Sequence, residues 1–320
     1  MVDTIVKAID NNKFCTGVFI DLKKAFDTVD HSLLIKKFKY YGVRGISSKF
    51  LDSYLNNRKQ FVSYQDVNST EQLIKCGVPQ GSILGPLLFI LYINDMCKVS
   101  KLLQFIVFAD DTNIFYLDND PFKMVKVINE ELKQLTMWFK VNKLSLNVTK
   151  SNYMIFSKTN QNVPNVKLNG IILEKVNCTK FLGVLIDNNL SWNNHIQSVQ
   201  TKIAKAIGAM YRIKNKVDSN ILLMIYNTLI LPHLAYCCEI WGNTYNTRLH
   251  CLVLLQKRAV RIIDMVGWRE HSSEIFKKYK ILKCNDLIAV IAYQTRFLIV
   301  KGKLRCTSRI KLKVKSMNKY

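Results

Sequence analysis

Three aspartates follow short apolar segments, a position that suits a divalent-metal site. Asp21 comes directly after the apolar run 16–20, and Asp110 and Asp111 separate two further runs. Carboxylate oxygens are hard ligands that suit Mg²⁺ and leave room for phosphate oxygens. Two such ions about 3.5–4 Å apart can hold both ends of an in-line phosphoryl displacement. Paired aspartates are also common in simple turns. The sequence between Asp21 and Asp110 is therefore needed to distinguish a metal site from ordinary turn residues.

The elements that would position these aspartates form a mixed α/β pattern. Asp30 is placed to cap a helix that Gly42 ends, and Pro121 occupies the favoured first turn of another helix. We expect strands at residues 16–20, 105–108, 114–117 and 153–156, a hairpin at 60–76, and helices at 31–41, 82–95 and 121–140. The polar segment 109–113 would then be a tight connection that carries two of the three aspartates.

The pattern becomes helical from about residue 190. Apolar residues recur there at intervals of three and four: Ile196, Val199, Ile203, Ile207 and Met210. The sequence that follows shows no clean alternation of the kind that marks half-buried strands. We therefore expect an α/β half followed by a mostly helical half, with the boundary near residue 188.

Composition limits the class of partner. The chain has 320 residues, and 47 lysines and arginines against 23 aspartates and glutamates give a formal charge of +24. A hydrophobic content of 49% allows a buried core and excludes a disordered basic tail or a low-complexity chain. Such an excess of positive charge indicates a polyanionic partner or, less often, an anionic membrane surface.

Cysteine usage and the apolar segments indicate a protein that is intracellular and not in a membrane. The nine cysteines form no CxxC pair and no cluster with zinc spacing, which favours reduced thiols. The N-terminus lacks the apolar region of a secretory signal. Residues 83–93 are too few to cross a bilayer, and polar residues interrupt the apolar stretch 221–241. Buried helices explain both stretches better.

Five ordered segments resemble the motifs of reverse transcriptases, with the greatest similarity to non-LTR (LINE-like, Jockey-type) retrotransposons. The first three resemble motifs A, B and C: IDLKKAFDTVDH at 20–31, GVPQGSILGPLLF at 77–89 and FADD at 108–111. The segment LNVTKS at 146–151 resembles motif D, and KFLGV at 180–184 resembles motif E, the primer grip. The resemblance extends over roughly residues 1–265.

This resemblance implies a fold and an activity. The fold would be α+β: a polymerase palm with a remnant of fingers at 1–188, a helical thumb at 189–265 and a basic C-terminal extension at 266–320. The activity would be that of an RNA-directed DNA polymerase that transfers deoxynucleotides to a primer 3′-hydroxyl with two Mg²⁺ ions, or Mn²⁺ in their place. The implied partners are an RNA template, a DNA primer and deoxynucleoside triphosphates, in the nucleus or the cytoplasm.

The resemblance implies that the three aspartates bind metal. Asp21 and Asp110 would bind both ions, and Asp111 would support them. The backbone carbonyl of Leu22 would complete one coordination sphere. No protein nucleophile is needed, because the ions activate the primer hydroxyl and neutralise the developing charge.

The nucleotide pocket follows from motifs A and B. Backbone N–H groups of Lys24 and Ala25 would bind triphosphate oxygens, while the Lys24 side chain stays solvated. The ring of Phe26 would clash with a ribose 2′-hydroxyl and so select deoxynucleotides; without the motif around it, a core aromatic would be the simpler reading of this residue. Gln80 would pack against the incoming nucleotide, and Gly81 would allow close backbone approach. An RNA polymerase or intron maturase would instead use ribonucleotides.

Motifs D and E carry the remaining expected roles. Lys150 would donate a proton to the leaving pyrophosphate, although a solvated lysine fits the sequence nearly as well. Phe181, Leu182 and Gly183, in an apolar strand, would hold the primer end. Core packing of that strand is compatible with this role.

Basic residues on the expected thumb helix would bind the primer-template through its phosphates, with affinity that depends on salt rather than sequence. They are Lys202, Lys205, Arg212, Lys214 and Lys216. Residues 301–320 contain eight further lysines and arginines and no acid. A solvated surface is the alternative explanation for both groups.

The chain departs from the family pattern at its beginning. Met1 lies only 20 residues before Asp21, whereas the family places a fingers region before motif A. The expectation is therefore an N-terminally truncated reverse transcriptase. The alternative is a catalytically inactive remnant that still binds nucleic acid.

Overall fold

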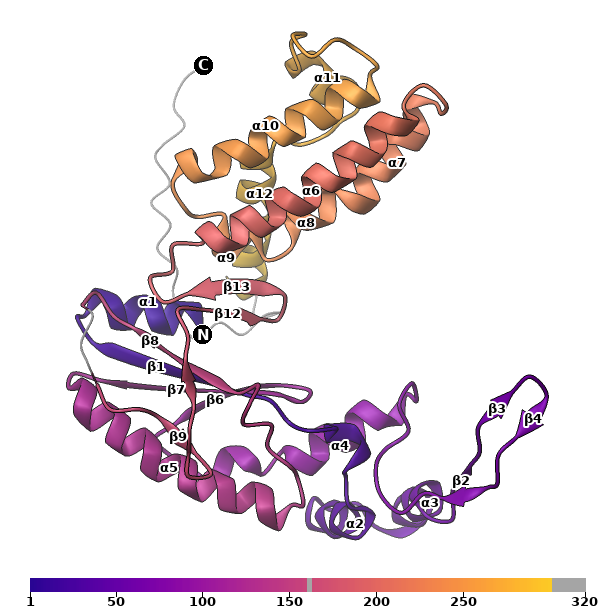
Figure 1. Cartoon of the computed structure of the whole chain (residues 1–320), viewed down its shortest axis with the longest axis vertical. Helices are drawn as coiled ribbons and strands as arrows, with labels where there is room; N and C mark the ends of the chain where they lie inside the picture. Colours follow the sequence, from indigo (N-terminus) through magenta and orange to yellow (C-terminus); the bar gives the residue numbers. More distant parts are fainter. Residues whose placement is uncertain (160–162, 301–320) are drawn as a thin grey trace. The chain divides into compact units, whose positions relative to one another are not determined.

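The computed structural model of the chain describes residues 1–159 and 163–300, which divide into two compact units (Figure 1). The first unit comprises Met1 and Ile5–Asn177, and the second comprises Val2–Thr4 and the chain from Cys178 onward. Helix α1 (Val2–Asp10) thus contributes to both units. This division comes before residue 188, and the functional boundary predicted there stays a prediction.

The first unit is built on a five-stranded sheet in the order β11-β8-β1-β7-β6. Its strands are β1 (Phe14–Ile20), β6 (Gln104–Phe108), β7 (Asp111–Asp118), β8 (Asn152–Phe156) and β11 (Glu174–Lys175). All neighbours are antiparallel except β8 and β11. The four long strands are confirmed, but the expected connection 109–113 is wrong, because β7 already begins at Asp111.

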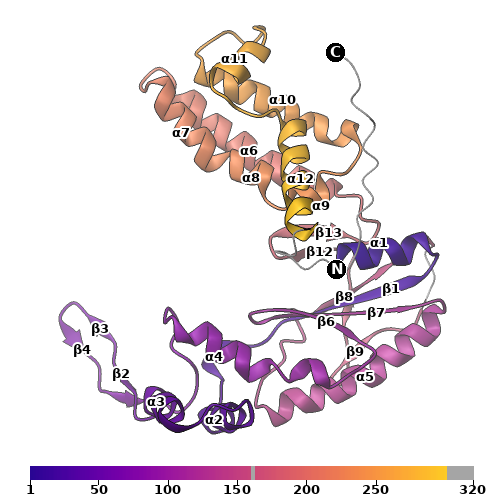
Figure 2. The same ribbon diagram turned by 180° about the vertical axis from the view of Figure 1, so that it is seen from behind.

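Helix α5 (Pro121–Val141) covers one face of this sheet (Figures 1 and 2). The Asp120 side chain caps it by accepting a hydrogen bond from the Phe122 N–H at 2.8 Å, and Pro121 occupies the first turn as expected. Six apolar residues on its inner face are at most 1% exposed: Met124, Val125, Ile128, Leu132, Leu135 and Phe139. Their burial fixes the helix against the strands that carry the aspartates.

Between β1 and β6 the chain forms α2 (His31–Tyr40), α3 (Gly45–Leu55) and α4 (Leu84–Ile93). Asp30 caps α2 by accepting from the Leu33 N–H at 2.9 Å, as its position predicted. Two short 3₁₀ turns also occur, η1 (Ala25–Asp27) and η2 (Met96–Lys98).

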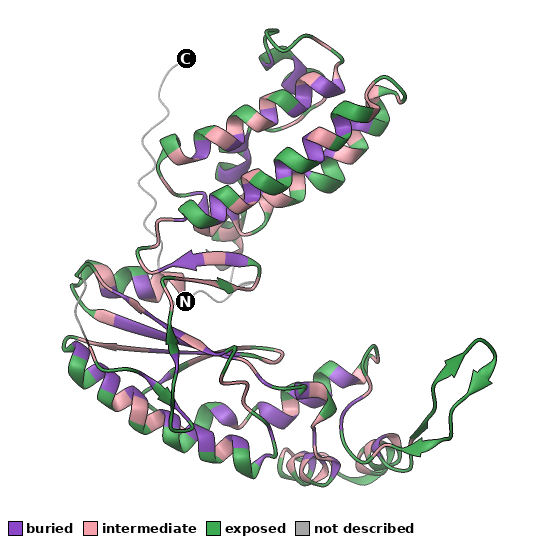
Figure 3. Ribbon diagram, viewed as in Figure 1, coloured by how far each residue is buried: buried purple, intermediate pink, exposed green. Residues whose placement is uncertain are grey.

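The expected hairpin follows α3 and is confirmed. It pairs β2 (Lys59–Gln60) with β5 (Gln72–Leu73), and β3 (Ser63–Tyr64) with β4 (Val67–Asn68). All four strands are exposed on both sides (Figure 3). A second hairpin, β9 (Lys167–Leu168) with β10 (Ile171–Ile172), lies beside α5.

The second unit begins with the hairpin β12 (Cys178–Phe181) and β13 (Val184–Asp187) and is otherwise helical, as expected. Its helices are α6 (Asn193–Ile213), α7 (Ser219–Leu229), α8 (Leu231–Ala235), α9 (Cys238–Trp241), α10 (Asn246–Ile263), α11 (Ser273–Lys278) and α12 (Cys284–Val300). The basic segment 301–320 lies outside the described residues. Within those residues, no helix is both long and apolar enough to span a bilayer.

Candidate catalytic site

Sheet register brings the three aspartates to one edge of the first unit. Strands β1 and β7 are neighbours, and Ile20 pairs with Thr112. Asp21 therefore leaves β1 beside Asp111, the first residue of β7. Asp110 directly precedes Asp111 in the β6–β7 turn, where Phe108 pairs with Asp111. The segments that resemble motifs A and C thus meet at the same strand ends.

The charges of these carboxylates act on one another. Burial, and then the negative charges of Asp110 and Asp21, raise the pKa of Asp111. Among the described residues, no three histidine, cysteine, aspartate or glutamate side chains form a ready-made metal centre. Mg²⁺ sites commonly use only one or two carboxylates and complete their shell with waters and substrate phosphates. The mutual repulsion and the all-oxygen donor set therefore fit a divalent cation that arrives with its substrate.

The turn that carries Asp110 has an unusual backbone. Ala109 has φ +52°, in the left-handed region. A residue with a Cβ atom pays about 1–2 kcal/mol for this conformation. The cost is consistent with a turn shaped to present the two aspartates rather than for minimum backbone energy.

Asp21 is held by the segment that resembles motif D. The Asn147 Nδ2 donates to Asp21 Oδ2 at 2.7 Å, and the Asn147 backbone N–H donates to the Asp21 carbonyl at 2.9 Å. Ser151 Oγ accepts from the Asp21 N–H at 3.1 Å and donates to the Asn147 carbonyl at 2.8 Å. Both the backbone and the carboxylate of Asp21 are therefore fixed in orientation.

Sequence reasoning missed these two positioning residues. Asn147 and Ser151 lie in the segment 146–151 that we matched to motif D, but we gave a role only to Lys150. The Lys150 side chain is exposed. Its backbone N–H bonds the Asn147 carbonyl at 3.1 Å, and its proposed role as an acid stays a prediction. The resemblance to motif D was the signal that could have directed attention to Asn147.

Next to Asp21, the chain pairs with the segment that resembles motif D. Leu22 forms an isolated antiparallel bridge with Leu146. The hydrogen bonds of this bridge come from the neighbours, Lys23 N–H to the Ser145 carbonyl at 2.8 Å and Asn147 N–H to Asp21. The Leu22 carbonyl is thus not used in the bridge.

The turn after Leu22 places Lys24 and Ala25 at the start of η1. Lys24 has φ +48° and its carbonyl accepts from Asp27 N–H at 2.9 Å. The first N–H groups of any helical turn lack partners within it. Ala25 is buried and Lys24 is exposed, so the solvated reading of the Lys24 side chain agrees with its position.

Phe26 is half-buried and stacks on Phe89 of α4, with ring centroids 4.6 Å apart and planes at 30°. The two readings of Phe26 are therefore compatible. One face of the ring packs against the core, and the residue is still partly accessible.

The segment with Gln80 is bound to η1. Val78 N–H donates to the Phe26 carbonyl at 2.8 Å, and Gln80 Nε2 donates to Asp27 Oδ1 at 2.8 Å. Gly77 has φ +89°, and a Cβ there would lie 2.9 Å from the Asp27 carbonyl oxygen, so only glycine fits. Gly81 also needs glycine because of its φ of +80°, but no atom lies within 4 Å of its Cβ position. The expected close approach of a nucleotide to the Gly81 backbone stays a prediction.

The expected primer-grip residues lie in the second unit, and one expectation about them is wrong. Phe181 ends β12, but Leu182 and Gly183 form the turn to β13 rather than part of a strand, with φ +45° and +84°. Tyr236, which sequence reasoning did not identify, donates its hydroxyl proton to the Leu182 carbonyl at 2.7 Å. Its ring would lie 3.3 Å from a Cβ at Gly183. Tyr236, the residue after α8, therefore fixes this turn.

The basic residues of the expected thumb helix do not all lie on a helix. Helix α6 ends at Ile213, so Lys214 and Lys216 follow it, and the expectation that they are helical is wrong. Lys214 lies over the Tyr211 ring, 4.4 Å from its centroid. Lys202, Lys205, Arg212 and Lys216 are exposed.

Comparison with known sequences gives relatives over most of this chain. It is 28% identical to "Probable RNA-directed DNA polymerase from transposon X-element" of Drosophila melanogaster, over 90% of this chain and 32% of the relative. It is 26% identical to "RNA-directed DNA polymerase from mobile element jockey" of the same organism, over 91% and 33%. The corresponding protein from transposon BS is 30% identical, over 81% and 30%. The chain spans about a third of the length of these relatives.

Among solved structures, telomerase from Candida albicans in complex with a TWJ fragment of telomeric RNA matches 88% of this chain and 54% of its own, at 13% identity and a TM-score of 0.47. The sequence profile of the family "Reverse transcriptase (RNA-dependent DNA polymerase)" matches residues 3–186. Members of that family generally depend on divalent metal ions. Since the match covers more than half of the chain and includes the edge formed by Asp21, Asp110 and Asp111, the protein belongs to the reverse transcriptase family.

Proposed function

We propose that the chain is the polymerase core of a non-LTR retrotransposon, which copies an RNA template into DNA. The observation that supports this proposal most strongly is the meeting of Asp21, Asp110 and Asp111 at one sheet edge, with Asp21 held by Asn147. The fold is the α+β arrangement expected of a polymerase palm. The proposed substrates are deoxynucleoside triphosphates and a DNA primer on an RNA template.

The three carboxylates and the Leu22 carbonyl would hold two Mg²⁺ ions, or Mn²⁺ ions in their place. When bound, the ions lower the pKa of the primer 3′-hydroxyl and neutralise charge on the reacting phosphate. Asn147 holds one carboxylate oxygen of Asp21 and Ser151 holds its backbone N–H, so together they fix the orientation of Asp21. This positioning avoids reorganisation of the carboxylate during the reaction.

Other residues of the first unit would bind the nucleotide. The N–H groups of Lys24 and Ala25 would donate to triphosphate oxygens, and Phe26 would exclude a ribose 2′-hydroxyl. Its stacking on Phe89 limits the freedom of the ring to move away from a ribonucleotide. Gln80, bound to Asp27, would contact the incoming nucleotide.

The remaining assignments rest on the family resemblance. Lys150 would protonate the leaving pyrophosphate. The turn formed by Phe181, Leu182 and Gly183 would hold the primer end, and Tyr236 would stabilise that turn through its bond to the Leu182 carbonyl. The exposed basic residues of α6 and the segment after it would contact primer-template phosphates, with residues 1–188 as palm, 189–265 as thumb and 266–320 as a basic extension.

The second candidate, an inactive remnant that binds nucleic acid, is less well supported. Asp21, Asp110 and Asp111 are all present, and so are Phe26 and Gln80. A remnant has no need for the hydrogen bonds that orient Asp21.

Primer extension on poly(rA)/oligo(dT) with Mg²⁺ or Mn²⁺ tests the proposal. We expect the wild type to incorporate dTTP and the variant Asp110→Asn to lose incorporation while it retains primer-template binding. An inactive wild type that still binds RNA with strong salt dependence would contradict the proposal and support the remnant.

A further inference from the structure

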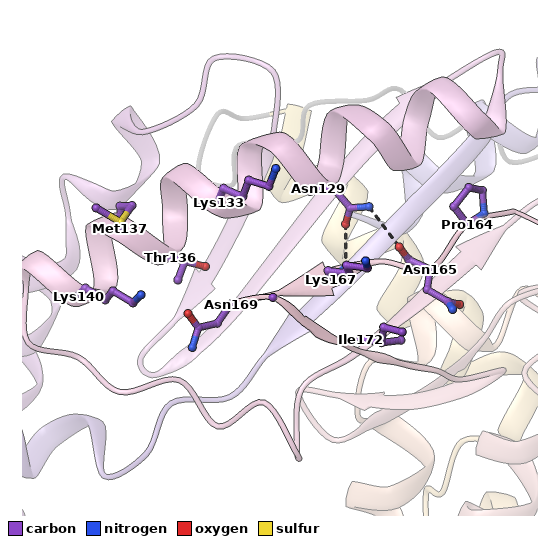
Figure 4. Close-up of a pocket in the computed structure, with 11 residues that line it drawn as sticks. Asn129, Lys133, Thr136, Met137, Lys140, Pro164, Asn165, Lys167, Asn169 and Ile172 are labelled. Atoms are coloured by element: carbon purple, nitrogen blue, oxygen red, sulfur yellow. Dashed lines mark hydrogen bonds between the residues drawn. The ribbon is translucent and has the colours of Figure 1, made fainter.

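A groove of about 760 Å³ lies between α5 and the β9–β10 hairpin, and it shares no residue with the aspartate edge. Helix α5 forms one wall with Lys133 and Lys140, and the hairpin forms the other with Lys167 (Figure 4). These lysines come from two separate segments of the chain and line one groove. The polymerase function proposed above assigns no role to this groove.

The groove is cationic and carries no compensating acid. Of the residues that line it, three are lysines and none is aspartate or glutamate. Lys133, Lys140 and Lys167 are exposed, and none of them belongs to an ion pair in the described part of the chain. The positive charges of these lysines are not compensated by an acid that lines the groove, so an anionic ligand would be attracted to it.

The Asn129 side chain bonds the two walls to each other. Asn129 of α5 accepts from the Lys167 N–H at 2.7 Å and donates to the Asn165 carbonyl at 3.2 Å, as Figure 4 shows. Val166 and Leu168, on either side of Lys167, are fully buried. The backbone that carries Lys167 is therefore fixed to the helix, and the groove is formed before any ligand binds.

The spacing of the lysines suits an extended polyanion better than a small anion. Lys133 and Lys140 are seven residues apart on α5, about two turns or roughly 10 Å along the helix. Between them, Met137 is 60% exposed, and Ile172 across the groove is 56% exposed. Apolar groups beside a row of cations can contact the bases or sugars of a strand whose phosphates bind the lysines.

We propose that this groove binds the sugar-phosphate backbone of single-stranded RNA, as a second nucleic-acid site apart from the catalytic edge. RNA is the chosen ligand because the chain has a net charge of +24 and belongs to a family that copies RNA templates. An acidic peptide would also be attracted to lysines, and it is an outcome of the test.

The test compares two double variants of the same helix. K133Q/K140Q removes two groove charges, and K123Q/K126Q removes two exposed lysines of α5 that do not line the groove. Both changes alter net charge and helix propensity equally. The binding of a fluorescent oligo(U) RNA is measured by anisotropy between 50 and 200 mM salt, with thermal unfolding as the control for folding.

Each lost phosphate contact lowers the slope of log affinity against log salt by about 0.7 for a single strand. Over a fourfold change in salt, two contacts correspond to a factor of about 7 in affinity. Between 50 and 200 mM salt, the affinity of the wild type should therefore fall about sevenfold more than that of K133Q/K140Q. K123Q/K126Q should behave as the wild type. Equal slopes for the two double variants would overturn the proposal.

A second measurement needs no variant. Acetylation of the wild type with and without the RNA should show protection of Lys133, Lys140 and Lys167 and none of Lys123. Protection by a poly-glutamate peptide but not by RNA would contradict the proposal. Asp110→Asn should retain the groove binding, so failure of the polymerase proposal and failure of this one are distinguishable.

Discussion

Asn147→Ala tests whether the orientation of Asp21 matters for catalysis. The substitution removes the 2.7 Å bond from Nδ2 to Asp21 Oδ2 and keeps the backbone bond between the two residues. A hydrogen bond to a charged group contributes about 1.5–3 kcal/mol. If that energy acts in the transition state, kcat falls by roughly 10- to 150-fold, because each 1.36 kcal/mol is a factor of ten.

The assay is steady-state primer extension, with kcat, KM for dTTP and the Mg²⁺ concentration for half-maximal activity measured separately. We expect kcat to fall, the Mg²⁺ requirement to rise and Tm to change little. Asn142→Ala is the matched control, because Asn142 Nδ2 donates to the neutral Trp138 carbonyl at 2.9 Å, away from the aspartates. It should lower Tm and leave kcat unchanged. A kcat for Asn147→Ala within twofold of the wild type would refute the reasoning.

Three further predictions concern specificity and stability. Phe26→Val removes the ring that stacks on Phe89, so the ratio of ribonucleotide to deoxynucleotide incorporation should rise, and an unchanged ratio would exclude a gating role. Burial, aided by the Lys202 charge, lowers the pKa of His195 to about 4, so the unfolded state binds a proton that the native state rejects. Stability of the second unit should therefore fall as pH decreases from about 6.5 to 4, on the order of 2–4 kcal/mol, and His195→Asn should flatten this dependence in chemical unfolding. Burial and the charges of Asp110 and Asp21 raise the pKa of Asp111, so this carboxyl holds its proton to higher pH in metal-free native protein than in the unfolded chain. The contribution of Asp111 to stability therefore decreases as pH rises from the ordinary aspartate pKa through the raised one. Asp110→Asn should thus raise the metal-free Tm at pH 7 more than at pH 3, and an equal shift at both would contradict the shared repulsion.

The strands and most helices were predictable because their signals are local. Short apolar runs bounded by polar residues identified β1 and β8, and the cap at Asp30 and the first-turn Pro121 marked two helix starts. Helix α3 was missed because only Leu55 of its residues is buried, which leaves little apolar periodicity to detect. The end of α6 was placed too late because the lysines after Ile213 are compatible with a helix.

The site was predictable only in part. The motifs identified Asp21, Asp110 and Asp111, but their approach depends on the pairing of β1 with β7 about a hundred residues later in the chain. The bond from Asn147 to Asp21 joins residues 126 positions apart, and no local pattern reveals such a contact. Long-range hydrogen bonds of this kind follow from tertiary packing, which a single sequence does not display.

The central claim is that Asp21, Asp110 and Asp111 bind metal at one sheet edge, and localised cleavage by bound iron tests it without relying on activity. Fe²⁺ is supplied in place of Mg²⁺ with primer-template and dTTP, and ascorbate with peroxide generates radicals that cut the backbone near the ion. The account predicts cuts close to residues 21 and 110 in the wild type, suppressed by excess Mg²⁺ and absent from the Asp21→Asn/Asp110→Asn variant. Cuts elsewhere in the chain, or unchanged cuts in that variant, would contradict it.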